Sequence, residues 1–97
     1  MYASIRKAQV IPGVKEQFVQ QVREGFLPMM RELPGFLTYY LVDTGPESYA
    51  SVTLFADKAG AEEAGKRAAE WSQTNMAPLM AAPLDVLVGE VVVKEGK

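Results

Sequence analysis

The chain has 97 residues, a formal net charge of −2, and neither cysteine nor histidine. The missing residue types exclude disulfides, thiolate-bound zinc, iron–sulfur clusters and histidine-based catalysis, and the acidic balance offers no basic surface for nucleic acid. The length and the ordinary apolar content predict one domain over residues 1–97. No stretch is long and apolar enough for a membrane span, and the N-terminus lacks the apolar segment of a secretory signal, so we expect a cytoplasmic protein.

The first predicted elements are a strand and a long helix. Residues 2–10 alternate in the two-residue period of a strand. From residue 14 to residue 33 the apolar side chains instead follow a helical period and fill one arc of the wheel. Pro28 lies inside this helix and cannot donate to the carbonyl of Glu24, which predicts a kink. Pro34 ends the helix.

A hairpin, a second helix and a last strand follow. Residues 36–43 and 48–56 are rich in strand formers and flank a Gly-Pro turn. Asp57 is the expected N-cap of a helix that runs to about Met80. Residues 84–93 form a final strand that is apolar on both faces, which predicts that it is well buried. The stripe of the second helix that we expect to face the sheet is Ala61, Ala64, Ala68, Trp71, Asn75 and Leu79.

This order of elements, βαββαβ, predicts an α+β fold of the ferredoxin-like type. Its four-stranded antiparallel sheet would carry both helices on one face. The other sheet face would have no helices, and a second copy of the chain is the simplest cover, in a homodimer through the sheet face. The side chains that we expect on this uncovered face are Ser4, Arg6, Thr38, Tyr40, Tyr49, Ser51 and Phe55.

The candidate site residues begin with the second helix, which carries Trp71 and Asn75 one turn apart. Trp71 is either a rigid wall for a planar ligand or an anchor that fills the core. A buried Asn75 would donate to a substrate carbonyl or phenolate, or would bond a strand carbonyl or a tyrosine hydroxyl. Tyr39 and Tyr40 are adjacent in a strand, so one lies beneath the helices and the other on the opposite face.

Further candidates come from the first strand and the helix ends. Arg6 either orients an anionic ligand or pairs with a carboxylate across the subunit interface. Met30 and Met76 either form an adaptable pocket mouth or fill the core. The sequence has no phosphate-binding loop, no nucleophile elbow and no carboxylate cluster with metal spacing, so no metal site is expected.

Several segments resemble the antibiotic-biosynthesis-monooxygenase-like family of dimeric α/β barrels. They are Ala-x-Ile-Arg in the first strand, FLPMMRELPGF at residues 26–36, the Tyr39-Tyr40 pair, and FADKAGAE at residues 55–62. The resemblance implies subunits that pair sheet to sheet, with a small pocket between sheet and helices. Some members oxygenate phenolic or quinol compounds without metal or flavin. The matching residue types here are Arg6, Tyr39 or Tyr40, Trp71 and Asn75.

Another branch of that family degrades haem, and this sequence departs from it. That branch has an asparagine on the first strand, a tryptophan on the second helix and a histidine as axial ligand. The first strand here reads Ser4-Ile5-Arg6, and the chain has no histidine, so haem chemistry of that type is not expected.

The resemblance thus implies a cofactor-independent monooxygenase that acts on a small aromatic or quinol compound. Two alternatives remain open. One is a non-catalytic ligand-binding or stress-related module of the same fold, and the other is a structural dimer with a filled core.

Overall fold

The computed structural model describes residues 1–96. Within this range no helix is both long and apolar enough to cross a membrane. The elements in chain order are β1 (Tyr2–Gln9), α1 (Lys15–Gln21), the π-helical turn η1 (Val22–Phe26), α2 (Leu27–Arg31), β2 (Phe36–Gly45), β3 (Ser48–Phe55), α3 (Lys58–Asn75), the 3₁₀ turn η2 (Ala77–Leu79) and β4 (Asp85–Glu90).

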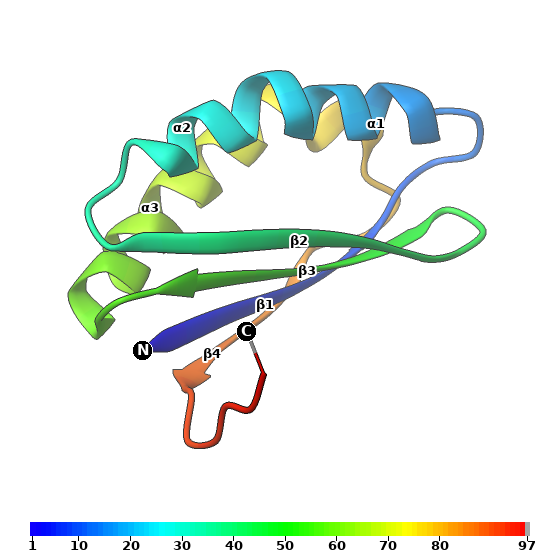
Figure 1. Cartoon of the computed structure of the whole chain (residues 1–97). Helices are drawn as coiled ribbons and strands as arrows, with labels where there is room; N and C mark the ends of the chain where they lie inside the picture. The colour runs from blue at the N-terminus through cyan, green and yellow to red at the C-terminus, as the bar shows by residue number, and fades with distance from the viewer. Residues whose placement is uncertain (97) are drawn as a thin grey trace.

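The four strands form one sheet in the order β2-β3-β1-β4, and every neighbouring pair is antiparallel. The helices lie together on one side of this sheet (Figure 1). This is the ferredoxin-like α+β arrangement that the element order predicts. In the register, Arg6 on β1 lies opposite Ser51 on β3, and Ser51 lies opposite Leu41 on β2. These residues therefore point to the same face of the sheet.

The long helix predicted over residues 14–33 is present but divided into three pieces. The kink expected at Pro28 takes the form of the π turn η1, which ends two residues before the proline. There the N–H of Leu27 donates to the carbonyl of Val22, five residues earlier. A π turn holds one residue more than an α turn, so η1 is wider than the helices on either side of it.

The second helix begins as predicted and ends earlier than predicted. The Asp57 side chain accepts a hydrogen bond of 2.8 Å from the N–H of Gly60, as an N-cap does. Helix α3 ends at Asn75, and the chain continues into η2 instead of remaining α-helical to Met80. Its buried residues are Ala61, Ala64 and Ala68. These small side chains let the helix lie close to the sheet.

The uncovered face of the sheet differs from the predicted one. Thr38 and Tyr40 do lie on it, because they pair with Leu54 and Val52. The prediction is wrong for the other five residues, which point toward the helices: Ser4, Arg6, Tyr49, Ser51 and Phe55. Alternation shows which side chains share a face, and here both faces carry apolar residues, so it does not show which face the helices cover. The large apolar side chains exposed on the open face are Ile5, Tyr40, Val42 and Leu87.

The last strand is shorter and more exposed than predicted. β4 covers Asp85–Glu90, and all six residues are exposed in the single chain, so the predicted burial is wrong for these six, whereas Leu84 is half-buried against the core. The strand lies at the edge of the sheet and pairs only with β1. Leu87 is 66% exposed and Val88 53%. An apolar edge strand of this kind is a surface that proteins usually cover.

Candidate functional site

A cavity lies between the helix layer and the sheet, with a volume of about 50 Å³. The side chains that line it come from β1, α1, η1, β2, β3, α3 and the segments before and after η2. Most of them are apolar, and five are aromatic: Phe18, Phe26, Tyr39, Tyr49 and Trp71. The cavity is the place where the fold leaves its hydrophobic core incompletely filled.

The aromatic side chains contact one another in two groups. The Phe26 ring meets the Trp71 ring edge-on, with 5.5 Å between ring centroids and an interplanar angle of 61°. The Phe26 centroid also lies 5.7 Å from that of Tyr39. The Phe18 and Tyr49 rings are stacked, with centroids 4.7 Å apart. These distances fall in the range of favourable aromatic pairs, so the walls are held by mutual contact.

The sheet contributes a polar floor to this otherwise apolar cavity. Arg6 on β1 and Ser51 on β3 both line it, together with Tyr39 on β2. Burial lowers the pKa of the Arg6 guanidinium, and neighbouring Tyr39 partly opposes that change. Burial likewise raises the pKa of the Tyr39 phenol, and the Ser51 hydroxyl and the Arg6 charge partly offset this. Tyr39 is therefore a neutral hydrogen-bond donor at physiological pH.

Among the residues that the structure describes, Arg6 alone is charged and lines the cavity. It is half-buried, and within residues 1–96 it forms neither an ion pair nor a side-chain hydrogen bond. A guanidinium that has lost part of its hydration and has no carboxylate partner attracts an anionic oxygen strongly. The site can therefore hold a flat apolar group against its aromatic walls and an ionised oxygen at its floor.

The size of the cavity limits what enters it without rearrangement. Pockets for drug-sized ligands measure roughly 300–1,000 Å³, whereas this cavity of about 50 Å³ has room for only a few water-sized groups. Met76 and Met80 line the cavity beside η2, together with Leu84. Unbranched methionine side chains change rotamer readily. A ring compound would therefore enter as these side chains move.

The structure brings four of the seven predicted site residues together and separates the others. Trp71, Tyr39, Arg6 and Met76 all line the cavity. Tyr40 lies on the open face of the sheet and is 59% exposed. Met30 is completely buried in the core and does not line the cavity.

Asn75 does not occupy the buried position that the helical stripe predicts. It is exposed, and its Nδ2 donates a hydrogen bond of 3.0 Å to the carbonyl oxygen of Trp71. Asn75 is the last residue of α3, and the buried position goes to Met76, which follows it. The prediction of a buried amide at Asn75 is therefore wrong.

Several cavity residues were missed by the sequence reasoning. Phe18 and Phe26 stand out in the sequence only as part of the apolar arc of the first helix. Tyr49 and Ser51 were assigned to the wrong face of the sheet, although their alternation along β3 did show that they share a face. Ser72, which also lines the cavity, stands in the sequence only as a residue that flanks the predicted buried stripe of the second helix.

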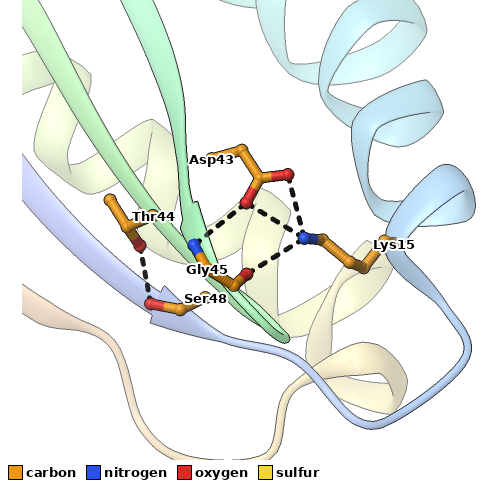
Figure 2. Close-up of polar contacts among 5 residues, drawn as sticks. All are labelled: Lys15, Asp43, Thr44, Gly45 and Ser48. Carbon is orange, nitrogen blue, oxygen red and sulfur yellow. Dashed lines mark hydrogen bonds and ion pairs between the residues drawn. The ribbon is translucent and has the colours of Figure 1, made fainter.

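An ion pair between Lys15 and Asp43 joins the start of α1 to the β2–β3 hairpin (Figure 2). Lys15 Nζ lies 2.9 Å from Asp43 Oδ2 and donates to the carbonyl of Gly45 at 3.0 Å. The hydrogen bond between Lys15 and Asp43 is the main reason why the pKa of Asp43 is lowered and that of Lys15 is raised. Lys15 Nζ also lies 5.2 Å from the centroid of the Tyr49 ring. The lysine therefore helps to position one aromatic wall.

The described residues offer no ready metal site. Within residues 1–96 no three carboxylates gather closely enough to hold a metal ion, and the sequence supplies no histidine or cysteine.

Comparison with known proteins places this geometry in context. A family model described as "Antibiotic biosynthesis monooxygenase" matches residues 1–74. No functionally curated protein is significantly similar in sequence.

Among solved structures, NE2512 of Nitrosomonas europaea, a protein of unknown function, superimposes with a TM-score of 0.84 at 20% identity, covering 99% of this chain and 93% of that one. A single-residue variant of MhuD, solved with two manganese protoporphyrin IX per active site, gives 0.77 at 21% identity and covers both chains completely. The ActVA-Orf6 monooxygenase of Streptomyces coelicolor, solved with nanaomycin D, gives 0.73 at 16% identity, covering 96% of this chain and 92% of that one. All three share the fold described above.

Proposed function

The chain belongs to the antibiotic biosynthesis monooxygenase family, and from that premise we propose that it oxygenates a small phenol or quinol without a cofactor. The observation that carries the proposal is the unpaired Arg6 at the floor of a cavity with aromatic walls. An uncharged aromatic ligand would leave that cation without a partner. A ligand with an ionised ring oxygen would satisfy both the walls and the floor.

In this proposal each lining group has one task. Trp71 and Phe26 flank the ring of the ligand, and Arg6 binds its oxygen. The positive charge stabilises the phenolate form and so lowers the pKa of the bound phenol. Tyr39 stays protonated, because burial raises its pKa, and it donates a hydrogen bond instead of acting as a base. The proton of the ligand leaves to water.

The ionised ligand supplies the electrons for the reaction. Where the ring carries a methylene group conjugated to the phenolate, O₂ converts that CH₂ group to C=O and releases one water molecule. One oxygen atom enters the product and the other enters water, so no external reductant is needed. The contribution of the protein is to hold the ionised form in a site that excludes bulk water.

Two structural relatives that were solved with a ligand support a ligand-binding role. The ActVA-Orf6 monooxygenase holds nanaomycin D, and the MhuD variant holds manganese protoporphyrin IX. We propose a smaller ligand here, because the cavity measures about 50 Å³.

Oxygen consumption with an anthrone-type phenol tests the proposal. We expect protein-dependent uptake of one O₂ per product formed. Arg6→Met should lower kcat/KM by about 100-fold, in the range found when one group that stabilises developing charge is lost. The exposed Arg67→Met is the matched control and should leave the rate unchanged. The absence of protein-dependent uptake, or an unchanged rate in Arg6→Met, would contradict the proposal.

A non-catalytic binding function is the second candidate. It is favoured by one observation: burial raises the pKa of Tyr39, the phenol beside Arg6 at the floor of the cavity, away from neutrality, which makes Tyr39 a poor base. A ligand that quenches the fluorescence of Trp71, the only tryptophan in the chain, without consuming oxygen would support this second function over the first.

We also propose that two copies of the chain pair through the open face of the sheet. Ile5, Tyr40, Val42 and Leu87 are each at least 39% exposed on this face. A cluster of large apolar side chains on one face is unusual for a monomer. Light scattering at micromolar concentration should give the mass of a dimer, and Leu87→Asp should give that of a monomer. A monomeric unmodified protein would contradict the pairing.

A further inference from the structure

The contact between Gly25 and Trp71 joins the π turn to the wall of the cavity. Gly25 is the fourth residue of η1. A Cβ atom placed on it would lie 2.7 Å from Cζ2 of Trp71 and 3.4 Å from Cε2. Carbon atoms do not approach so closely without displacement, so the indole occupies space that any other residue at position 25 would fill.

The indole lies between this glycine and the cavity. Trp71 lines the cavity and Gly25 does not. Phe26, the next residue of the π turn, meets the indole edge-on at 5.5 Å between centroids. Two consecutive residues of η1 therefore hold the tryptophan: Gly25 by having no side chain and Phe26 by contact. A side chain at position 25 would push the indole away from the helix and toward the cavity.

We propose that Gly25 is a specificity-determining residue, because it lets Trp71 lie back against the π turn and so sets the size of the ligand that the cavity accepts. The small volume of about 50 Å³ makes this position decisive, since a slight displacement of the indole takes up a large share of the space. The inference rests on the proposed function in one respect, that ring compounds enter this cavity.

The first test needs no ligand, because Trp71 is the only tryptophan in the chain. In Gly25→Ala the indole should move into apolar surroundings, so its emission should shift to shorter wavelength and acrylamide should quench it less. Gly65→Ala is the matched control, since a Cβ on Gly65 of α3 meets nothing within 4 Å. It should change neither signal. Unchanged emission in Gly25→Ala, or a shift to longer wavelength, would overturn the inference.

The second test measures size selection by calorimetry under exclusion of oxygen, with hydroquinone and 1,4-naphthohydroquinone as one-ring and two-ring probes. In Gly25→Ala the affinity for the two-ring probe should fall by about tenfold, which is the usual effect of one added carbon in a tight pocket. The affinity for the one-ring probe should fall far less. In a Trp71→Phe background, where the smaller ring leaves room for a Cβ, Gly25→Ala should have little effect. Equal losses for both probes, or a full loss in the Trp71→Phe background, would refute size selection.

The two tests separate the inference from the proposed function. If neither probe binds the unmodified protein, the proposed ligand class is wrong and its size selection with it. The emission shift would still show that Gly25 holds the indole back from the cavity.

Discussion

Replacing Arg6 with methionine should stabilise the protein while it weakens ligand binding. Arg6 is half-buried, lies on the helix-covered face of β1 and has no hydrogen-bonding or ionic partner among residues 1–96. Its lowered pKa has burial as its main cause, which means that the folded state disfavours the charge. Methionine keeps most of the unbranched stem and removes the guanidinium.

The size of the effect follows from the cost of an unsatisfied buried polar group. That cost is about 1–3 kcal/mol. Because Arg6 retains part of its hydration, we expect the low end, about 1 kcal/mol of added unfolding free energy. For a domain of about 100 residues this raises Tm by about 4–8 °C. Such a gain at the expense of binding is common for residues kept for function.

Thermal and urea unfolding of the ligand-free protein measure this effect. Arg67→Met on α3 removes the same charge from an exposed position, and it should change the unfolding free energy by less than about 0.5 kcal/mol. If Arg6→Met lowers Tm, the guanidinium has a stabilising partner, and the argument that it awaits an anionic ligand fails.

Two further predictions concern other polar groups. Thr53 is completely buried and its Oγ1 has no hydrogen-bond partner. Thr53→Val should therefore raise the unfolding free energy, measured by urea titration, by about 1 kcal/mol. A decrease would show that the hydroxyl has a hydrogen-bond partner. The folded-state pKa of Asp43 lies below its ordinary value, so its contribution to stability is present above the ordinary pKa and is lost as pH falls through the lowered one. The stability difference between the unmodified protein and Asp43→Asn should therefore shrink as pH falls below about 5; a difference independent of pH would contradict this.

The sequence was sufficient for the fold because local signals agreed. Segments with the two-residue period of a strand and segments with a helical period follow one another in the order βαββαβ. Asp57 and Pro34 mark helix boundaries that lie within a few residues of those in the structure. The kink near Pro28 was also predictable, because proline has no N–H to donate. Its form, a π turn ahead of the proline, was not predicted; in that turn Gly25 packs against Trp71, which lies far away along the chain.

The site was harder to predict because it depends on which face of the sheet the helices cover. Ser4, Arg6 and Ser51 are polar, and a polar row usually faces water. Here the row faces inward and Ile5 faces outward. A second copy that covers the outer face would explain why apolar residues lie there. Asn75 was misplaced for a different reason, because the helix ends at that residue and its side chain bonds back to Trp71.

The Lys15 interaction has a consequence for how a ligand gains access. Within residues 1–96 the hydrogen bonds of Lys15 are the only ones that a helix side chain makes to the sheet. Backbone hydrogen bonds also hold η2 to the chain that follows β1, where the N–H of Ile11 donates to the carbonyl of Leu79 at 2.9 Å. Between these points the layers meet through apolar contacts, which have no preferred direction and permit small sliding movements. The helices can therefore shift slightly over the strands between these fixed points without breaking polar bonds. Ligand uptake by such shear would exchange apolar surface alone, and its thermodynamic mark would be a negative change in heat capacity.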